Sequence, residues 1–507
     1  MPSTTARDTL VVAIDQGTSS TKAVAIDSSG RAVARTSVPL GQMHPQPGWV
    51  EQDPLELLSS VKTALGKIAS EVSGTIASVG ISTQRESAIA WDRASLEPLG
   101  PVLGWQDRRT SGEAQRLLEE GHGEKVRALT GLPIDPMFSA LKFAWLLDSI
   151  DPDRSRSRAG GIALGTVDSW IVHALTGEHR IETGNASRTL LLDLDSGDWD
   201  DSLADLFRIP SQALPRIAAS DEKTDPVTGV DGFPSGVAIA GVLADSHAAL
   251  FGHGIREPGA VKATYGTGSS VMGLLPPQAK PGDGLVRTVA WDFGKPVQAF
   301  EGNILSTGAT VKWLAQLLST TPDELSALAE RADGSSKVFL VPAFAGLGAP
   351  WWDDAARGII VGLTLGSSRE DLARAAFESV AFQIEDVLDV ADAGGKRIQT
   401  ILADGGPSAN RWLMQVQADL SQRDVRPSTT ADLSALGAAY LAGSSHGLWT
   451  DAEVTGFSES AETLHPALDA DAAMDRRSAW LDAVARARGV RLPASNSRRA
   501  ADKSRQP

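Results

Sequence analysis

The sequence contains no cysteine, no long apolar run and no excess of basic residues. The absence of cysteine excludes disulfides, thiol catalysis and cysteine-ligated metal. No window approaches the roughly 18 apolar residues of a membrane span, and residues 1–8 lack the regions of a signal peptide. The net charge of -16 argues against binding to nucleic acid, which needs a broad basic face. We therefore expect a cytoplasmic protein that binds neither membrane nor nucleic acid.

What the chain does contain is typical of a globular protein with more than one domain. It has 507 residues, of which 42% are hydrophobic and 22% are charged. A chain of this length exceeds a single hydrophobic core and divides into domains. We expect two domains, over residues 8–253 and 257–488, and a polar, basic tail over residues 489–507. The tail is interpreted as disordered, with a polyanion-binding arm as the alternative.

A short glycine-containing loop occurs twice, and both copies follow a run of β-favouring residues. The copies are Asp15-Gln16-Gly17-Thr18-Ser19 and Tyr265-Gly266-Thr267-Gly268-Ser269. Glycine lets the backbone turn tightly, so that N–H groups and hydroxyls can face an anion. Either loop alone could be an ordinary hairpin. Because the two are separated by about half the chain, we predict two related domains whose loops bind phosphate across a cleft.

Hydrophobic patterning predicts an α/β arrangement in both halves. Strands over residues 10–14, 22–26 and 32–38 should form an antiparallel meander with the first glycine loop at its first turn. Asp53 should cap a helix that starts at Pro54. Further expected elements are strands over residues 77–81, 237–243 and 399–402, and helices over residues 139–147, from Ser367 or Ser368 to Gly394, and after Asn410.

A series of polar and aromatic motifs runs through nearly the whole chain. The motifs are Asp15-Gln16-Gly17-Thr18, Gln84-Arg85-Glu86, Trp105-Gln106-Asp107-Arg108-Arg109, Gly165-Thr166-Val167-Asp168, Asn185-Ala186-Ser187-Arg188-Thr189, Tyr265-Gly266-Thr267-Gly268 and Asp404-Gly405-Gly406. In this order they resemble the FGGY family of carbohydrate kinases, and within it the glycerol kinases. The resemblance implies two duplicated actin-like (ribonuclease-H-like) domains with an interdomain cleft, in agreement with the repeated loop.

The resemblance further implies transfer of the γ-phosphoryl group of ATP to a hydroxyl of a small polyol or sugar. Asp245 would be the general base, and Asp15 and Asp245 would hold Mg²⁺. The alternative for Asp245 is that it only caps the helix that follows. The implied nucleotide-binding residues are Gly17, Thr18, Ser19, Lys22, Gly266, Thr267, Gly308, Lys312, Gly406 and Asn410. Gly308 could instead be a packing glycine within a helix.

The resemblance also implies a set of acceptor-binding residues. They are Arg85, Glu86, Trp105, Met137, Asp245, Ser246 and Ser270. Arg85 and Glu86 would offer hydrogen-bond donors and acceptors, and Trp105 an apolar wall. As a bare dipeptide, Arg85-Glu86 could equally be a surface ion pair.

Three acceptor positions depart from the pattern of the glycerol kinases. Where those enzymes usually have Tyr, Gln and Phe around glycerol, this chain has Met137, Ser246 and Ser270. These changes predict a larger pocket. Glycerol, converted to sn-glycerol 3-phosphate, is the best single prediction for the acceptor, and a longer polyol or small sugar such as erythritol or a pentitol is the alternative.

A function of another class is also open, because actin-like folds serve as switches or filaments that use ATP without a small-molecule acceptor. The acceptor residues Arg85, Glu86 and Trp105 would have no reason to accompany the nucleotide site in such a protein. We also expect a homodimer or homotetramer.

Overall fold

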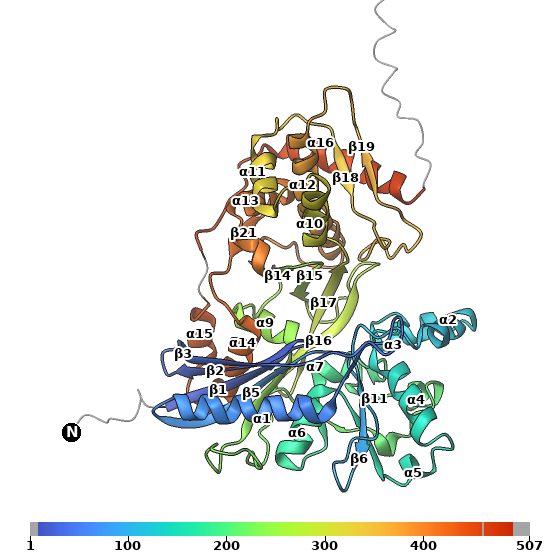
Figure 1. Cartoon of the computed structure of the whole chain (residues 1–507), viewed down its shortest axis with the longest axis vertical. Helices are drawn as coiled ribbons and strands as arrows, with labels where there is room; N and C mark the ends of the chain where they lie inside the picture. Colours follow the sequence, from blue (N-terminus) through green and yellow to red (C-terminus); the bar gives the residue numbers. More distant parts are fainter. Residues whose placement is uncertain (1–8, 459–460, 490–507) are drawn as a thin grey trace, which may run out of the picture.

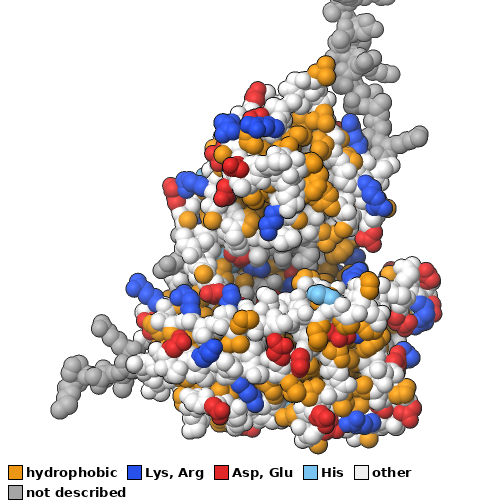
Figure 2. All heavy atoms as spheres, viewed as in Figure 1, with side chains coloured by type: hydrophobic (Ala, Val, Ile, Leu, Met, Phe, Trp, Pro, Cys, Tyr) orange, Lys and Arg blue, Asp and Glu red, His pale blue; other side chains and the backbone are white. Residues whose placement is uncertain are grey.

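The computed structural model describes residues 9–458 and 461–489, which form two bodies (Figure 1). The molecular surface is hollowed between them (Figure 2). The predicted tail, apart from its first residue, lies outside the described residues. In Figure 2 basic and acidic side chains are interspersed over the visible face. Within the described ranges, every helix is too short or too polar to span a bilayer.

The first sheet contains the predicted meander. Its strands are β1 (Thr9–Gln16), β2 (Ser20–Asp27), β3 (Ala32–Pro39), β5 (Thr75–Thr83) and β13 (Ile239–Ala244), in the order β13-β5-β1-β2-β3. The β1–β2 and β2–β3 pairs are antiparallel, whereas β5 runs parallel to both β1 and β13. Because parallel strands are covered on both faces, β1 and β13 are almost continuously apolar and buried.

The second sheet repeats this arrangement. Its strands are β14 (Ala260–Tyr265), β15 (Ser269–Leu274), β16 (Val286–Asp292), β17 (Pro296–Ile304), β20 (Thr400–Asp404) and β21 (Asp424–Pro427), in the order β16-β17-β15-β14-β20-β21. From β17 to β21 the pairing is antiparallel twice and then parallel twice, as it is from β3 to β13. The duplicated α/β fold with an interdomain cleft is therefore confirmed.

Short strands and helices complete the first half. They are β4 (Glu51–Gln52), α1 (Pro54–Glu71), β6 (Ile89–Asp92), β7 (Val102–Leu103), α2 (Ser111–Glu119), α3 (Gly123–Thr130), α4 (Ser139–Ile150), α5 (Ser155–Arg158), β8 (Ile162–Gly165), α6 (Val167–Thr176), β9 (Arg180–Glu182), α7 (Thr183–Ala186), β10 (Leu192–Asp193), β11 (Asp198–Trp199), α8 (Asp201–Leu206), β12 (Arg216–Ala218) and α9 (Asp245–Gly252). As predicted, Asp53 caps α1 by accepting the N–H groups of Leu55 and Glu56. Leu57, Val61 and Leu65 then pack α1 onto the first sheet.

The second half is richer in helix. Its remaining elements are α10 (Gly308–Leu317), α11 (Pro322–Arg331), β18 (Phe339–Val341), β19 (Ile359–Val361), α12 (Arg369–Ala393), α13 (Arg411–Ser421), α14 (Leu433–His446), α15 (Asp451–Gly456) and α16 (Ala470–Ala487). Ser368 opens α12 and α13 follows Asn410, as predicted, and the side chain of Asn410 also caps α13. Phe377, Val380 and Ile384 of α12 belong to the main core of this half.

One helix of the second half crosses back to the first sheet. Helix α14 lies beside β1 and β5 in Figure 1, and it is in backbone contact with β5 and α9. A Cβ on Gly80 would lie 2.2 Å from the carbonyl oxygen of Ala438, and a Cβ on Gly437 only 1.8 Å from that of Ala248. Glycine at these positions lets the backbones touch, and it fixes the N-termini of α9 and α14 beside each other. The linear domain boundaries at residues 253 and 257 remain a prediction.

Candidate active site

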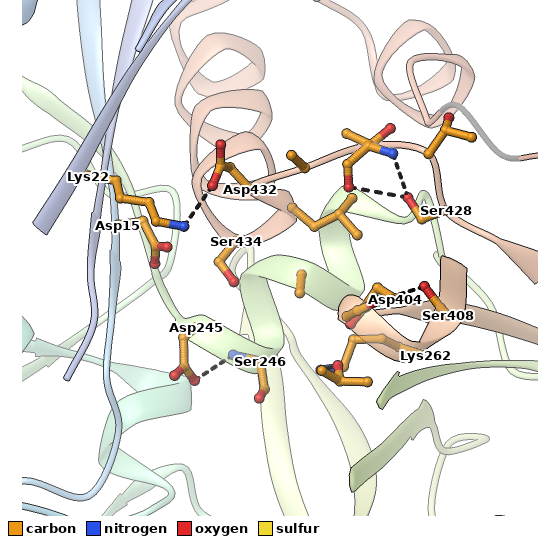
Figure 3. A pocket seen from close by; sticks show the side chains of 17 residues that line it. Asp15, Lys22, Asp245, Ser246, Lys262, Asp404, Ser408, Ser428, Asp432 and Ser434 are labelled. Carbon is orange, nitrogen blue, oxygen red and sulfur yellow. Dashed lines mark hydrogen bonds and ion pairs between the residues drawn. The ribbon is translucent and has the colours of Figure 1, made fainter. Parts of the chain in front are cut away.

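A pocket of about 510 Å³ at the floor of the cleft is lined by both halves of the chain (Figure 3). Asp15 and Lys22 come from β1 and β2, and Asp245 is the first residue of α9. The second half contributes Lys262 and Thr264 of β14, Asp404 at the end of β20, and the segment 428–434 before and at the start of α14. The strand ends of the two sheets thus meet at this pocket, where open α/β sheets usually bind ligands.

The two carboxylates predicted to hold a metal face the same pocket. Burial and the nearby carboxylate of Asp245 raise the pKa of Asp15 to about 6, although Ser82 donates a hydrogen bond to it at 3.0 Å. The Asp245 side chain is 41% exposed towards the cleft. Burial of its surroundings nevertheless raises the pKa of Asp245, and the guanidinium of Arg85 opposes that rise. A cation between the two carboxylates would relieve their repulsion.

Two helices direct their N-termini at this pocket. Asp245 and Ser246 open α9, and Leu433 and Ser434 open α14. Unpaired backbone N–H groups and the helix dipole make such ends favourable for phosphate. Lys22 was predicted to neutralise phosphate. Its Nζ lies in the pocket but donates to Asp432 at 2.7 Å, so its charge is partly compensated.

A second cavity, of about 630 Å³, lies wholly within the second half. It is lined by every nucleotide-binding residue predicted there, namely Gly266, Thr267, Gly308, Lys312, Gly406 and Asn410. Val311, Phe377 and Val380 supply an apolar wall. A mostly apolar cavity with a few polar groups suits a flat base and ribose.

Gly308 combines the two roles that the sequence left open. It is the first residue of α10, and its N–H donates to the carbonyl oxygen of Gly266 at 3.0 Å. A Cβ at this position would lie 2.4 Å from that oxygen. Gly308 therefore packs α10 against the second glycine loop and lines the cavity.

The first glycine loop is a tight hairpin between β1 and β2, closed by the Gly17 N–H to the Ser20 carbonyl at 3.0 Å. The described residues that line the two cavities do not include Gly17, Thr18 or Ser19. The indole N–H of Trp105 instead donates to the Thr18 hydroxyl at 3.2 Å. The loop therefore contacts a predicted acceptor residue.

Glutamine side chains join the same loop to the segment that carries Arg85 and Glu86. Gln84 Nε2 donates to the side-chain oxygens of Gln16, at 3.1 Å, and of Gln52, at 2.9 Å. Gln52 Nε2 in turn donates to the Thr18 carbonyl at 2.8 Å. Because Gln16, Gln52 and Gln84 are buried and bonded to one another, the loop and the acceptor segment are held in fixed relation.

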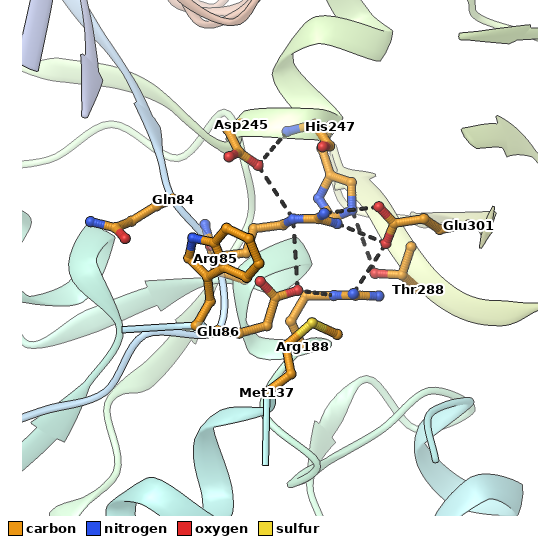
Figure 4. Close-up of polar contacts among 12 residues, drawn as sticks. Gln84, Arg85, Glu86, Met137, Arg188, Asp245, His247, Thr288 and Glu301 are labelled. Carbon is orange, nitrogen blue, oxygen red and sulfur yellow. Dashed lines mark hydrogen bonds and ion pairs between the residues drawn. The ribbon is translucent and has the colours of Figure 1, made fainter. Parts of the chain in front are cut away.

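Arg85 and Glu86 are buried, with 9% and 4% exposure, and do not form a surface ion pair (Figure 4). They follow β5, and Arg85 Nε lies 3.3 Å from Asp245 Oδ1. Glu86 has a positive φ of 61°, a strained conformation for this residue type. The chain thus brings the predicted acceptor pair and the predicted base into contact.

The remaining predicted acceptor residues surround this cluster unevenly. Met137 lies beside Glu86 and Arg188 in Figure 4. Ser270 donates to Glu301 at 3.1 Å, and Ser246 lines the pocket at the cleft floor. Trp105 is 38% exposed. The three departures from the glycerol kinase pattern therefore lie next to Asp245, to Glu301 and to Glu86 respectively, in the order Ser246, Ser270 and Met137.

Sequence reasoning missed Glu301 and His247, and it quoted Arg188 in a motif without giving it a role. Glu301 and Arg188 are fully buried beside Arg85. Burial and the charges of Arg85 and Arg188 lower the pKa of His247 well below its usual value, so the imidazole is neutral. Sequence reasoning also missed the segment 428–434. Its run of hydroxyl residues before a helix, Ser428-Thr429-Thr430, was a usable signal for an anion site.

Comparisons with known proteins agree with this geometry. The model of the FGGY family of carbohydrate kinases, N-terminal domain, matches residues 10–252, and that of the C-terminal domain matches residues 261–446. The chain is 43% identical to a glycerol kinase of Paraburkholderia phytofirmans, covering 88% of this chain and 91% of the relative. It is also 43% identical to one of Burkholderia cenocepacia, covering 94% and 98%.

Solved structures give the same result. The crystal structure of Plasmodium falciparum glycerol kinase with ADP matches with a TM-score of 0.91 and 29% identity, covering 96% of this chain and 99% of that one. A gluconate kinase from Lactobacillus acidophilus, at 23% identity and a TM-score of 0.86, shows the shared fold. The fold and the cleft are those of ATP-dependent phosphotransferases with an actin-like architecture. The chain belongs to the FGGY family of carbohydrate kinases.

Proposed function

We propose that the protein is a glycerol kinase, which transfers the γ-phosphoryl group of ATP to a terminal hydroxyl of glycerol and releases sn-glycerol 3-phosphate and ADP. The observation that carries the proposal is the position of Asp245. It lies between the pocket faced by two helix N-termini and the buried Arg85–Glu86 pair. The relatives named glycerol kinase, at 43–44% identity, support glycerol as the acceptor.

Phosphoryl transfer needs positioning, charge neutralisation and a base near the attacking hydroxyl. Arg85 and Glu86 would bind the acceptor hydroxyls, and Trp105 would cover its carbon chain. The Asp245 carboxylate would take the hydroxyl proton while that oxygen bonds to the γ-phosphorus and the bond to the β–γ bridging oxygen breaks. A raised pKa suits a base, because it increases affinity for the proton.

The nucleotide would span the two cavities. Gly308, Gly406 and Asn410 would surround the adenosine in the cavity of the second half. Lys312 is exposed at the same cavity and would approach from the solvent side. The second glycine loop, Gly266-Thr267, would donate to the phosphates, with Lys22 supplying positive charge. A phosphate contact by Gly17-Thr18-Ser19 remains a prediction, because these residues line neither cavity.

Mg²⁺ fits the residues at the cleft floor. Among the described residues no group of three or more His, Asp or Glu side chains is placed to hold a metal ion. Asp15 and Asp245 line one pocket, and burial and the charge of Asp245 raise the pKa of Asp15, so the pair suits an ion that completes its shell with water and phosphate oxygens, as Mg²⁺ does. Bound there with ATP, the ion would neutralise phosphate charge.

A longer polyol is the second candidate acceptor, and a specific observation favours it. Met137, Ser246 and Ser270 lie around Arg85 and Asp245, where glycerol kinases carry larger or aromatic side chains. The space they leave would admit four- or five-carbon chains such as erythritol or a pentitol.

A substrate panel tests the proposal. ADP formation is measured with ATP, Mg²⁺ and glycerol, erythritol, ribitol or xylitol, and the product is identified by phosphorus NMR. We expect the highest kcat/KM with glycerol and a signal of glycerol 3-phosphate. A higher kcat/KM with a longer polyol would favour the second candidate, and ADP formation that no polyol stimulates would contradict both.

The assembly and the location of the protein remain predictions. We infer a homodimer or homotetramer, which sedimentation velocity tests directly, and a cytoplasmic location, which fractionation of the native host tests. A monomer at micromolar concentration would contradict the first inference.

A further inference from the structure

The guanidinium of Arg85 is held from the opposite half of the molecule (Figure 4). Its Nη1 and Nη2 donate to the two carboxylate oxygens of Glu301, at 3.0 and 2.8 Å. Glu301 lies on β17 of the second sheet and is fully buried. Such a forked pair fixes both the place and the rotation of the guanidinium.

Arg188 completes a cluster of alternating charges. Its Nε donates to Glu86 Oε1 at 2.7 Å, and its Nη2 lies 3.1 Å from Glu301 Oε2. Arg85 Nε lies 3.7 Å from Glu86 Oε1 and closes the ring. Two arginines and two glutamates sum to zero charge, so no charge in this buried ring is left without a partner.

The ring determines which way Arg85 faces. Glu301 accepts one N–H from each Nη atom of Arg85. The Nε edge of the guanidinium is therefore turned towards Asp245, with Arg85 Nε 3.3 Å from Asp245 Oδ1. The other N–H of each Nη atom is not used by Glu301. Arg85 already lies within ion-pair distance of Asp245 and Glu86 through its Nε atom. Without the Glu301 charge, its Nη groups would also turn towards these two carboxylates and occupy oxygens that the acceptor needs.

We propose that Glu301 is a positioning residue for the acceptor, which holds the Nη groups of Arg85 from the second half so that only its Nε edge faces Asp245 and Glu86 and their remaining oxygens can bind polyol hydroxyls. The inference rests on the proposed function. Glu301 acts through Arg85 and has no assigned contact with the acceptor. Ser270, itself predicted to touch the acceptor, donates to Glu301 at 3.1 Å and would act in the same way.

The chain offers a matched control. Glu378 of α12 is also a buried carboxylate between two arginines, Arg374 and Arg476. It lies outside the residues that line either cleft cavity. Glu378→Gln should therefore cost stability without changing acceptor kinetics, whereas Glu301→Gln should change both.

The test compares steady-state kinetics of the wild type, Glu301→Gln, Glu301→Asp and Glu378→Gln with ATP and glycerol. We expect Glu301→Gln to lower kcat/KM for glycerol by at least about tenfold, the scale of a lost charged hydrogen bond, with the KM for ATP unchanged. Glu301→Asp, which keeps the charge, should recover part of the loss. Glu378→Gln should keep the wild-type kcat/KM.

The outcomes separate this inference from the proposed function. A wild type that phosphorylates no polyol overturns the function and the inference together. An active wild type with an unaffected Glu301→Gln variant, or with an equal loss in Glu378→Gln, overturns only the positioning role. If Glu301→Gln does not fold, Glu301→Asp replaces it, because its shorter side chain cannot hold both Nη atoms of Arg85 at the native distances, and an unchanged kcat/KM for glycerol in that variant contradicts the inference.

Discussion

The two sides of the cleft are built differently. On the acceptor side, the buried Glu301 accepts hydrogen bonds from the buried Arg85 and forms an ion pair with the buried Arg188. On the nucleotide side, the cavity of about 630 Å³ is lined by glycines, apolar side chains and the exposed Lys312. The geometry of the acceptor side is set by ion pairs between distant segments, and the geometry of the nucleotide side is set by backbone shape.

This difference indicates how each side achieves selectivity. A rigid, charge-balanced cluster orients a small acceptor whose few hydroxyls give little binding energy. An open cavity can bind a large nucleotide through area and backbone contacts. Changes on the acceptor side should therefore alter chemistry and stability, whereas changes on the nucleotide side should alter ATP affinity alone.

The largest expected effect is at the junction of the two sides. Asp245→Asn keeps the size and hydrogen bonding of the side chain but removes the base. We expect kcat to fall on the order of 10²–10⁴-fold while glycerol still binds, because loss of a general base has this scale. Steady-state kinetics and titration calorimetry measure the two quantities. Near wild-type turnover would contradict the assignment, and Asp148→Asn on the surface serves as the control.

Breaking the charge ring should cost stability. Arg188→Ala leaves the buried Glu86 and Glu301 without this partner, a change that costs about 3–5 kcal/mol in other buried pairs. Urea unfolding gives the free energy. Arg208→Ala removes an exposed partner of Asp148 and should cost under about 1 kcal/mol. Equal losses of unfolding free energy in the two variants would show that the charge ring contributes no more stability than a surface ion pair.

A methyl group added on the nucleotide side should affect only the KM for ATP. In Gly308→Ala the new Cβ must displace the Gly266 carbonyl, which lies 2.4 Å away. We expect the KM for ATP to rise about tenfold through the misplaced loop, with the KM for glycerol unchanged. Gly112→Ala, where a Cβ meets nothing within 4 Å, is the control. A parallel rise in both KM values would undermine the separation of the two sides.

The packing beneath the acceptor side should respond to pH. Burial raises the pKa of Glu182, which caps the helix leading to Arg188, to about 8, despite hydrogen bonds from Ser220 and Asn185, and nearby Asp168 contributes to the rise. A raised folded-state pKa adds stability below the unfolded value of 4.5, and this stability is lost as the pH rises to 8.

We therefore expect Glu182→Gln to remove a slope of up to about 1.4 kcal/mol per pH unit between pH 6 and 8. Urea unfolding of both proteins over this range measures it. The difference between the proteins cancels the titration of other groups, including Lys142, whose pKa burial lowers to about 7. Identical slopes would contradict the raised pKa.

An effect of about the same size as that of Gly308→Ala concerns the choice of acceptor. Met137→Tyr, Ser246→Gln and Ser270→Phe together should shift the ratio of kcat/KM for glycerol over erythritol upwards by about tenfold, the scale of small contact changes in a pocket. Wild type and triple variant are compared on the same panel. An unchanged ratio would mean that the three departures are neutral.

The local parts of this fold were accessible from the sequence. The strands around Gly17, the capped helix after Asp53 and the long helix after Ser368 follow from apolar periodicity and turn residues, and all three are observed. For each element, the residues that signal it lie within about twenty residues of one another. Neighbouring side chains therefore suffice to predict the element.

The rest of the site depends on contacts between distant segments. Glu301 is 216 residues from Arg85, and Arg188 is 102 residues from Glu86. Neither pairing has a local signature, because any buried charge needs a partner and the sequence does not say which. The return of α14 to the first sheet was missed for the same reason.

If the cleft joins ATP to a polyol acceptor, ADP release from the wild-type protein should depend on the acceptor. The measurement is the rate of ADP release with ATP and Mg²⁺, in the presence and absence of glycerol. We expect slow release without glycerol and a saturable increase of at least about tenfold when glycerol is added, because the attacking hydroxyl is then held beside Asp245. An ADP release rate that glycerol does not change would contradict this role of the cleft.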